Sequence, residues 1–361
     1  MVDNKKILII TGTRPEVIKM APVFHALKRN NVYVDWCHTG QHDELAMQAF
    51  NIFNIKPTYI LSRPEGNSVT SLLSGLMNNV QQILEMISYD AVLVHGDTAT
   101  TLAGAKAAFY NQIPIIAHVE AGLRSGDLRH PFPEESNRIL VSKLATKHYA
   151  PTLLAYAALV SEGVPTSNIM LTGNTVVDAQ LYLLEQGLLP NEKSNNIIVT
   201  AHRRENWNNI KTICNALIKL SELRPDLIFK FAVHPNPIVR TQVEEALLGQ
   251  DKIHIIDSLD YFELQKSLVS AKLVITDSGG IQEETPTYRI PTVVLRKTTE
   301  RPEAINEGFS ILAGAECEEE IVKACLLMLD KTISDEMKNP FGDGKASLKI
   351  ADDLVRMLNA F

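Results

Sequence analysis

Short apolar runs of four to six residues alternate along the chain with segments in which apolar residues recur every three or four positions. Residues 7–10 form the first run, and Val17, Met20, Ala21 and Phe24 follow it at helical spacing. Further apolar runs lie at 32–37, 91–94, 113–119 and 169–171. This alternation is typical of βαβ units. Because the runs are apolar almost throughout, we expect strands of a parallel sheet that is covered on both faces.

The alternation is interrupted near residue 190, where the sequence turns polar. Residues 188–196 lack periodicity and include Pro190, so this stretch is the best linker candidate. A second series of apolar runs follows at 197–200, 228–233, 253–256, 273–276 and 292–295. A loop rich in Gly and Asp at 341–344 and an amphipathic helix near 350–358 close the chain. We therefore predict an α/β protein of two parallel-sheet domains that bind a ligand in the cleft between them, at the carboxyl ends of their strands.

Length and composition support this organisation. At about 150 residues per domain, 361 residues correspond to two domains. Apolar residues make up 45% and charged residues 21% of the chain, which is ordinary globular usage. The 35 basic and 42 acidic residues give a net charge of −7, so the chain has no basic excess with which to bind nucleic acid. An anionic ligand is therefore expected to be small and bound locally.

Cysteine spacing and the length of the apolar runs favour a cytoplasmic protein. Cys37, Cys214, Cys317 and Cys325 are far apart and form no CxxC pair, so neither a disulfide framework nor a zinc site is predicted. We expect no leader peptide at the start, and no apolar run approaches the roughly 20 residues that span a bilayer. No membrane partner is expected.

Ionisable residues and glycines concentrate directly after the predicted strands. In the first domain these positions are 11–16, 95–98 and 118–124, and in the second they are 202–205, 234–237 and 277–280. Charged groups at strand ends are costly unless they are used, which favours a functional site over solvated loops.

The turn at 11–16 suits an anion. Gly12 would let backbone N–H groups approach it, with Arg14 as the counter-charge and a helix N-terminus behind. The alternative is a plain glycine turn in which Pro15 starts a helix. The turn lacks GxGxxG, which counts against an NAD-binding first βαβ unit.

A second anion candidate lies in the other domain. Ser278, Gly279 and Gly280 resemble a phosphate nest at the start of a helix, and a carboxylate one turn on, from Glu283 or Glu284, could accept hydrogen bonds from a ribose. A Gly-Gly strand exit is also common in α/β folds. The nest, taken with further cationic candidates, suggests a nucleotide diphosphate held between the domains. These cationic candidates are Arg14, His234 and Arg301, the last of which is equally interpretable as a solvated surface arginine.

Three carboxylates are candidates for proton transfer. Asp97 and Glu120 directly follow apolar strands, where desolvation raises the pKa of a carboxyl group and permits acid–base catalysis near neutral pH. Glu134 is the third. Glu134 and its neighbour Glu135 also have the simpler interpretation of acids in a first helical turn that complement the helix dipole, an interpretation that is stronger for Glu135.

Two histidines and an aspartate close strands of the second domain. His202 and His234 would stabilise a phosphate leaving group, although single histidines in such places are more often structural. Asp277 is a lone candidate for a metal ligand beside the nest and equally suits a helix cap, so no metal is predicted.

Eight motifs occur in order over nearly the whole chain. They read Gly12-Thr13-Arg14-Pro15-Glu16 with Lys19, His95-Gly96-Asp97, His118-Val119-Glu120-Ala121-Gly122-Leu123-Arg124, Pro133-Glu134-Glu135-Ser136-Asn137-Arg138, Gly173-Asn174-Thr175, His202-Arg203-Arg204-Glu205, Asp277-Ser278-Gly279-Gly280-Ile281-Gln282-Glu283-Glu284 and Thr299-Glu300-Arg301-Pro302-Glu303. This set resembles the bacterial non-hydrolysing UDP-N-acetylglucosamine 2-epimerases. In the hydrolysing relatives, the positions of Pro15 and Glu16 typically differ.

The resemblance implies a glycosyltransferase-B-type fold with two Rossmann-like domains. The N-terminal domain would span 1–172 and be joined by the last helix at about 347–361, and the C-terminal, UDP-binding domain would span 173–346. It further implies that a homodimer interconverts UDP-N-acetylglucosamine and UDP-N-acetylmannosamine as precursor for bacterial surface polysaccharide, without NAD, an obligatory metal or another cofactor.

The resemblance also implies roles for individual residues. Proton transfer would fall to the carboxylates Asp97, Glu120 and Glu134, with His202 assisting at the UDP side. The implied substrate contacts are Arg14, Ser278, Gly279 and Gly280 to the diphosphate, Glu284 to the ribose, and Lys19, Arg138, Arg203, His234 and Arg301 as further contacts.

The chemistry explains why such residues are needed. The C2 hydrogen of the sugar has no adjacent carbonyl, so in the family UDP leaves by elimination, which gives 2-acetamidoglucal, and is then added back. This route needs a base on one face, an acid on the other and positive groups at the phosphate. The alternatives are a 2-epimerase of a related sugar such as UDP-diacetamido-glucuronate, a glycosyltransferase of the same fold, and a non-catalytic nucleotide-sugar sensor. The presence of all three carboxylates favours an epimerase over the last two.

Three segments depart from the family pattern. Members that are activated by their own substrate usually show Gln-His-Arg-Gln where this chain has Gln41-His42-Asp43-Glu44, and an arginine where an ungapped alignment places Gly75. The Tyr-x-x-Phe motif near the uracil reads Tyr261-Phe262-Glu263-Leu264.

Overall fold

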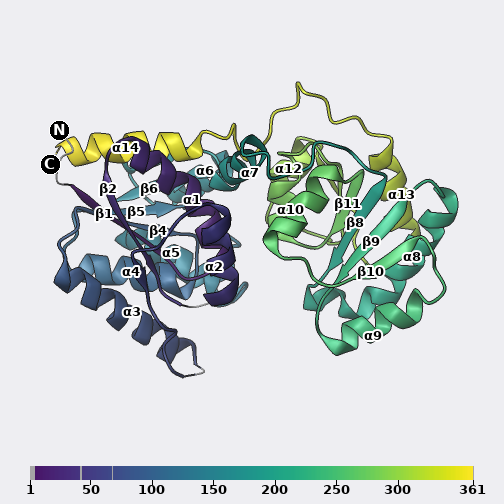
Figure 1. Cartoon of the computed structure of the whole chain (residues 1–361), viewed down its shortest axis with the longest axis horizontal. Coiled ribbons are helices and arrows are strands. Elements are labelled where there is room, and N and C mark those ends of the chain that lie inside the picture. Colours follow the sequence, from purple (N-terminus) through teal and green to yellow (C-terminus); the bar gives the residue numbers. More distant parts are fainter. Residues whose placement is uncertain (1–4, 41–42, 67, 361) are drawn as a thin grey trace. The chain divides into compact units, whose positions relative to one another are not determined.

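Two units, each built on one parallel β-sheet, make up the chain. The computed structural model describes residues 5–40, 43–66 and 68–360. One unit comprises Met1–Tyr182 together with Gly342–Phe361, and the other comprises Leu183–Phe341. Figure 1 shows helices on both faces of each sheet.

The sheet of the first unit has seven strands among the described residues, in the order β3-β2-β1-β4-β5-β6-β7. Its strands are β1 (Lys6–Thr11), β2 (Tyr33–His38), β3 (Tyr59–Ile60), β4 (Ala91–His95), β5 (Ile115–Val119), β6 (Lys147–Ala150) and β7 (Ile169–Leu171). Its helices are α1 (Arg14–Arg29), α2 (Asp43–Ile52), α3 (Val69–Met86), α4 (Ala99–Tyr110), α5 (Glu134–Leu144), α6 (Leu153–Ser161), α7 (Thr175–Glu185) and α14 (Ala346–Ala360), with a 3₁₀ turn at Thr166–Asn168. Residues 7–10 of β1 are fully buried, which confirms the prediction of a sheet covered on both faces.

The second unit has six strands within the described part of the chain, in the order β10-β9-β8-β11-β12-β13. These are β8 (Asn196–Ala201), β9 (Ile228–Val233), β10 (Ile253–Ile256), β11 (Leu273–Thr276), β12 (Thr292–Val294) and β13 (Ser310–Leu312). The helices are the 3₁₀ helix η2 (Arg204–Asn209), α8 (Ile210–Leu223), α9 (Pro237–Ala246), α10 (Tyr261–Ser270), α11 (Gly279–Glu284), α12 (Pro302–Asn306) and α13 (Glu318–Leu329).

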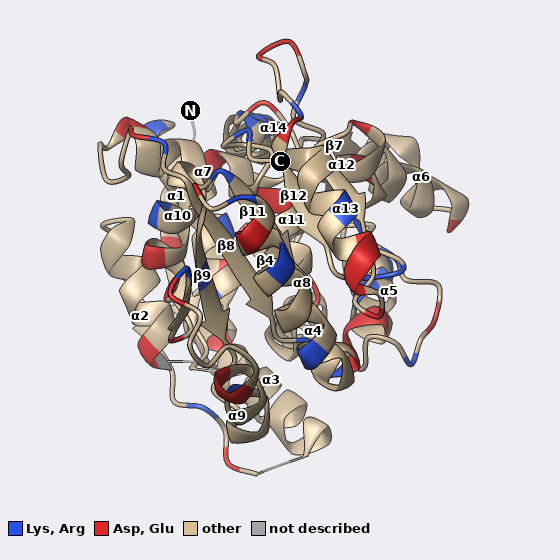
Figure 2. Ribbon diagram, turned by 90° about the vertical axis from the view of Figure 1, so that its right-hand side faces the viewer, with Lys and Arg blue, Asp and Glu red and all other residues tan. Residues whose placement is uncertain are grey.

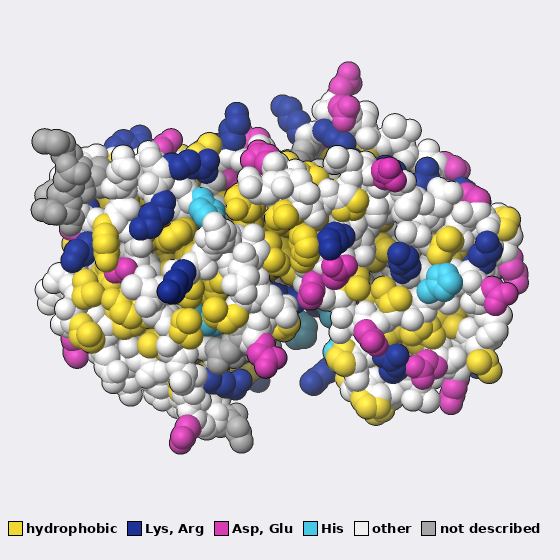
Figure 3. Space-filling view, viewed as in Figure 1, with side chains coloured by type: hydrophobic (Ala, Val, Ile, Leu, Met, Phe, Trp, Pro, Cys, Tyr) yellow, Lys and Arg dark blue, Asp and Glu magenta, His cyan; other side chains and the backbone are white. Residues whose placement is uncertain are grey.

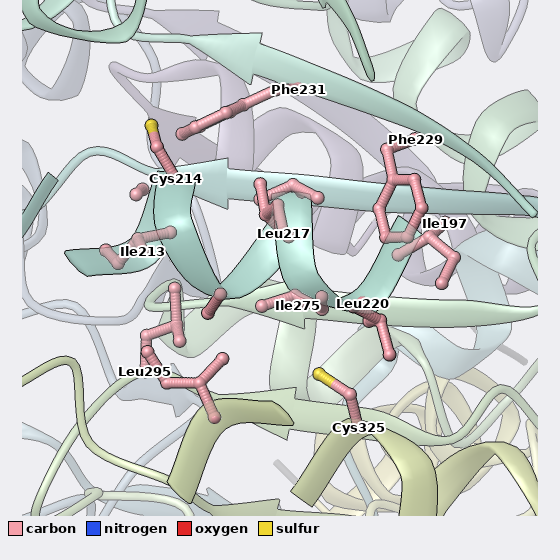
Figure 4. Close-up of a cluster of buried hydrophobic side chains, with 14 of the residues drawn as sticks. Ile197, Ile213, Cys214, Leu217, Leu220, Phe229, Phe231, Ile275, Leu295 and Cys325 are labelled. Carbon is pink, nitrogen blue, oxygen red and sulfur yellow. The ribbon is translucent and has the colours of Figure 1, made fainter. Parts of the chain in front are cut away.

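The core of the second unit forms where α8 packs on the sheet. Leu217 and Leu220 of α8 are buried against Phe229 of β9 and Ile275 of β11, and Cys325 of α13 joins them (Figure 4). All five side chains are at most 1% exposed. The predicted α/β class with two parallel sheets is confirmed.

The C-terminal helix returns to the first unit, as the family resemblance implied. Helix α14 packs against α1 (Figure 1). Asp178 of α7 fixes the start of α14, because its carboxylate accepts hydrogen bonds from Ser347 N at 2.8 Å, Ser347 Oγ at 2.6 Å and Ala346 N at 3.3 Å. Burial raises the pKa of Asp178 above its ordinary value, although these hydrogen bonds oppose the shift. The helix is thus anchored at its first turn.

Charged residues of both signs are interspersed over the described surface. Figure 2 shows basic and acidic residues spread over helices and loops, and on the face in Figure 3 lysine and arginine side chains stand singly among acidic and apolar ones. No helix within the described ranges is long and apolar enough to cross a membrane.

Candidate active site

The turn between β1 and α1 is organised by Glu16, a buried residue of α1. Its Oε2 accepts hydrogen bonds from Gly12 N at 3.0 Å and Thr13 N at 2.7 Å. Its Oε1 accepts from Thr98 Oγ1 at 2.8 Å. Burial raises the pKa of Glu16, while these hydrogen bonds oppose the shift. The expectation that Gly12 offers backbone N–H groups to an external anion is therefore wrong, because the carboxylate of Glu16 already accepts them.

The same turn leaves Arg14 available. Its side chain is partly buried and makes no hydrogen bond or ion pair with any other residue that the structure describes. Gly12 is required here by close approach, since a Cβ at this position would lie 2.1 Å from Thr100 Oγ1. Arg14 is therefore the group of this turn that suits an anion.

Asp97 and Glu120 leave adjacent strand ends. His95, the last residue of β4, pairs with Val119, the last residue of β5. Glu120 directly follows Val119, and Asp97 follows His95 after one intervening residue. Asp97 Oδ2 accepts hydrogen bonds from Arg138 of α5, at 2.8 Å from Nε and 2.6 Å from Nη2. The guanidinium therefore holds one orientation of the carboxylate.

Glu120 is held by groups from three other segments. Lys19 of α1 donates to Oε2 of Glu120, Asn174 Nδ2 donates to the same oxygen at 3.0 Å, and His95 Nε2 lies 3.8 Å from it. The backbone of Glu120 has a φ of +63°, a left-handed conformation that is uncommon for a residue with a side chain. Such backbone strain concentrates at functional sites.

A buried histidine fixes the turn before Asp97. His118 Nε2 lies 2.7 Å from Gly96 O, and Gly96 N donates to Val119 O at 3.0 Å. Burial lowers the pKa of His118 to about 3, so the ring is neutral and donates from Nε2. Gly96 is thereby held at both its N–H and its C=O.

Glu134 and Glu135 are neighbours at the start of α5 with different surroundings. Glu134 is partly exposed and forms no hydrogen bond or ion pair with another described residue. Glu135 is 1% exposed and accepts hydrogen bonds from Ser125 N, Gly126 N and Arg138 Nη1. Of the two, Glu134 is the carboxylate left for a ligand.

In the second unit, Asp277 organises the residues that follow β8. This carboxylate is fully buried and accepts hydrogen bonds from His202 N at 3.0 Å, Arg203 N at 2.9 Å and Asn206 Nδ2 at 3.0 Å. Ser278, not Asp277, is the N-cap residue of α11. The helix-cap interpretation of Asp277 is therefore wrong, because its oxygens face the 202–206 segment.

His202 lies beside this aspartate. Its Nδ1 is 3.1 Å from Asp277 Oδ1, which leaves Nε2 for a ligand. Burial lowers the pKa of His202, although Asp277 opposes the shift. Coulombic interactions with Arg203 and His234 lower the pKa of His202 further. Because Ala201 of β8 pairs with Val233 of β9, His202 and His234 follow adjacent strand ends.

The other residues of the second unit that are predicted to contact substrate form hydrogen bonds with neighbouring residues. His234 Nδ1 accepts from Asn236 N at 3.1 Å, which leaves its Nε2 as the donor. Glu284 Oε2 accepts from Gln265 Nε2 at 2.8 Å. Arg301 Nε donates to the buried Glu283. Arg301 is thus paired with a carboxylate, and its predicted contact with substrate stays a prediction.

The predicted nest lies at the start of α11. A Cβ at Gly279 would lie 3.8 Å from Arg203 Nη2, so the guanidinium of Arg203 borders Gly279. Ser278 Oγ faces Ile281 N at 3.5 Å as the helix cap. These groups place a guanidinium beside the N-terminus of a helix, an arrangement that suits a phosphate.

The structure thus gathers the predicted residues into local groups. In the first unit Asp97 joins Arg138 and Glu120 joins Lys19, and in the second unit His202 and Arg203 share Asp277. The burial of the Glu16 carboxylate, the contact of the Asn174 amide with Glu120 and the hydrogen bonds of Glu135 were not predicted from the sequence. Their signal was present in the sequence only as membership of the quoted motifs.

Comparisons with known proteins show to which family the chain is similar. The family model described as UDP-N-acetylglucosamine 2-epimerase matches residues 25–355. The probable UDP-N-acetylglucosamine 2-epimerase of Ralstonia nicotianae is 40% identical over 366 residues, covering 96% of this chain and 97% of that protein. The UDP-N-acetylglucosamine 2-epimerase of Escherichia coli K12 is 40% identical over 369 residues, covering 97% of this chain and 98% of that protein.

Solved structures extend the likeness to three dimensions. The UDP-GlcNAc 2-epimerase of Neisseria meningitidis, bound to UDP-GlcNAc, aligns with a TM-score of 0.86 at 36% identity, over 97% of this chain and 100% of that one. A glycotransferase of kitacinnamycin, at 10% identity and a TM-score of 0.65, shares the fold alone and agrees with the predicted glycosyltransferase-B-like class. With a family model that covers most of its length and full-length relatives at 40% identity, the chain belongs to the UDP-N-acetylglucosamine 2-epimerase family.

Proposed function

We propose that this protein interconverts UDP-N-acetylglucosamine and UDP-N-acetylmannosamine at C2 without hydrolysing them. The observation that carries the proposal is the pair Asp97 and Glu120 at the adjacent ends of β4 and β5. Each carboxylate is held by a cation from a different helix, Arg138 of α5 or Lys19 of α1. Carboxylates held by cations at adjacent strand ends are candidates for a functional site.

The reaction proceeds by elimination and re-addition of UDP. A carboxylate removes the C2 proton while the C1–O bond breaks and its electron pair stays on the β-phosphate oxygen, which gives UDP and 2-acetamidoglucal. In the reverse step the phosphate oxygen attacks C1 and a carboxylic acid delivers a proton to the opposite face of C2. Asp97, Glu120 and Glu134 supply the base and the acid. Proton and charge balance without an oxidant or a metal.

Groups of the second unit hold the departing diphosphate. Arg203 and the Ser278-Gly279-Gly280 helix start bind phosphate oxygens, and Arg14 is a further proposed phosphate contact. His202 is held by Asp277 through Nδ1 and offers Nε2 to the leaving phosphate. Further substrate contacts are His234 and Arg301, and Glu284 accepts hydrogen bonds from the ribose.

Proton NMR of purified protein with UDP-N-acetylglucosamine tests the proposal. Resonances of UDP-N-acetylmannosamine are the expected result. Free UDP with N-acetylmannosamine would indicate a hydrolysing enzyme, and turnover of UDP-diacetamido-glucuronate alone would indicate the related 2-epimerase. An unchanged spectrum with tight UDP binding would point to a sensor, and consumption only with added acceptor to a glycosyltransferase.

The wider setting follows from the family resemblance. We propose that the enzyme acts as a cytoplasmic homodimer and supplies precursor for bacterial surface polysaccharide. Light scattering of the purified protein gives the oligomeric state, and a mass of one chain would contradict the dimer. Loss of surface polysaccharide in a deletion strain, restored by the gene, is the corresponding test of the pathway.

A further inference from the structure

We propose that Glu135 is a positioning residue for the reaction, which acts by fixing Arg138 and, through it, Asp97. The inference rests on the proposed function, because it assigns Glu135 to the support of a carboxylate that transfers protons. All three residues belong to the same unit. Glu135 does not touch the reacting atoms in this proposal.

The surroundings of Glu135 exceed what a helix-dipole acid requires. An acid that only complements the dipole lies in the first turn and stays solvated. Glu135 is 1% exposed, and its Oε1 accepts hydrogen bonds from Ser125 N at 3.0 Å and Gly126 N at 3.1 Å. Its Oε2 accepts from Arg138 Nη1 at 3.1 Å. A buried carboxylate with three donors is costly to place, so these contacts are specific.

Arg138 divides its donors between two carboxylates. Nη1 faces Glu135, while Nε and Nη2 face Oδ2 of Asp97. Because a guanidinium is planar and its donors have a fixed geometry, fixing one edge fixes the other. Glu135 therefore sets the plane in which Arg138 presents its donors to Asp97.

Glu135 also secures the segment that leads to Glu134. Ser125 and Gly126 belong to the loop between β5 and α5, and Glu134 is the residue before Glu135 on α5. One buried carboxylate thus holds Asp97 through Arg138 and the start of the helix that carries Glu134. A small displacement of either group is expected to slow proton transfer, because the transfer depends on near-contact geometry.

Glu135→Gln is the informative substitution. The glutamine Oε1 still accepts from Ser125 N and Gly126 N, but its Nε2 donors face the donors of Arg138 Nη1. We expect kcat to fall between about 10-fold and 100-fold, with KM and the Kd for UDP within about twofold of the wild type. The matched control is Glu162→Gln, which removes a carboxylate held by Arg124 at 2.6 and 2.8 Å, and should leave kcat within about twofold.

A double-mutant cycle shows whether Glu135 acts through Arg138. Arg138→Lys keeps the positive charge but loses the planar guanidinium that bonds both carboxylates. The double variant Glu135→Gln/Arg138→Lys is expected to be about as slow as Arg138→Lys alone. If the two losses multiply, or if Glu135→Gln leaves kcat unchanged, the positioning role is overturned. Glu135→Asp keeps the charge in case Glu135→Gln fails to fold, and the same cycle applies to it. Wild-type protein that does not interconvert the two sugars overturns the proposed function and this inference together, whereas normal wild-type turnover with unaffected Glu135 variants overturns this inference alone.

Discussion

Lys19 of α1 donates a hydrogen bond to Glu120, 101 positions further along the chain, at the end of β5. Both side chains are largely buried, at 13% and 11% exposure. Lys19 was predicted as a substrate contact, and this pairing gives it a second task, since it compensates the charge of Glu120 in a site that also contains His95. Burying an ion pair in this way is stabilising only when the partners stay together.

The first prediction concerns this pair. Lys19→Met removes the ammonium and leaves the Glu120 carboxylate buried without its charge partner. We expect kcat to fall about 100-fold, equivalent to about 2.7 kcal/mol, with UDP affinity unchanged because most proposed UDP contacts lie in the other unit. Steady-state kinetics and calorimetry with UDP check this. A parallel loss of UDP binding would instead assign Lys19 to the diphosphate.

The second prediction concerns the proton-transfer carboxylates. Asp97→Asn and Glu134→Gln preserve size and remove the acid–base function, so each should abolish turnover and leave UDP affinity roughly intact.

In D₂O the wild-type enzyme should place deuterium at C2 of both epimers, because the proton passes to a carboxylate that exchanges with solvent. Product that keeps its original C2 proton would contradict this mechanism.

Periodicity and strand ends were readable from the sequence, whereas the partners of the site residues were not. Residues 7–10 and 91–94 are apolar, as expected of strands in a parallel sheet that is covered on both faces. The residues that follow these strands therefore lie together at the carboxyl edge of the sheet. The pairing of Arg138 with Asp97 joins positions 41 apart, and no local rule gives it. The role of Glu16 could not be predicted either, because a carboxylate in a first helical turn is usually interpreted as complementing the helix dipole. The structure shows instead that Glu16 is buried and accepts hydrogen bonds from Gly12 and Thr13.

The third prediction follows from His202. Its pKa lies below the ordinary value in the free protein, and a bound diphosphate would raise it by placing negative charge beside Nε2. UDP binding should therefore take up a proton, so that affinity rises as the pH falls from about 8 to about 6. Calorimetry in buffers of different ionisation enthalpy measures the uptake. His202→Asn controls for titration of UDP itself, and equal uptake by both proteins would remove His202 from the diphosphate site.

The fourth prediction concerns the anchoring of α14. Asp178→Ala removes the acceptor of three hydrogen bonds from Ala346 and Ser347, and leaves these donors buried. We expect a loss of about 2 to 4 kcal/mol in the free energy of unfolding. Urea denaturation measures it. Asp352→Ala, at an exposed position of α14 itself, is the control, and a comparable loss in that variant would show that the hydrogen bonds of Asp178 are not responsible.

The last prediction concerns activation by substrate at a second site, which in regulated family members uses a glutamine and an arginine where this chain has Glu44 and Gly75. Glu44 lies exposed on α2, and Gln41 and His42 of the same motif lie outside the described residues. An arginine at Gly75 would not fit without a shift, because a Cβ there would lie 2.3 Å from Pro64 Cβ. Loss of a guanidinium removes a bidentate phosphate partner, and a carboxylate in place of an amide repels a diphosphate.

Each change is expected to cost about 1 to 3 kcal/mol of binding, and about 1.4 kcal/mol already lowers affinity tenfold. We therefore expect the enzyme to convert pure UDP-N-acetylmannosamine without a lag and with hyperbolic kinetics. Progress curves started from that epimer decide the matter. A lag that a trace of UDP-N-acetylglucosamine abolishes, with sigmoidal dependence on its concentration, would show that the second site is intact and that the alignment of these positions with the family motif is misplaced.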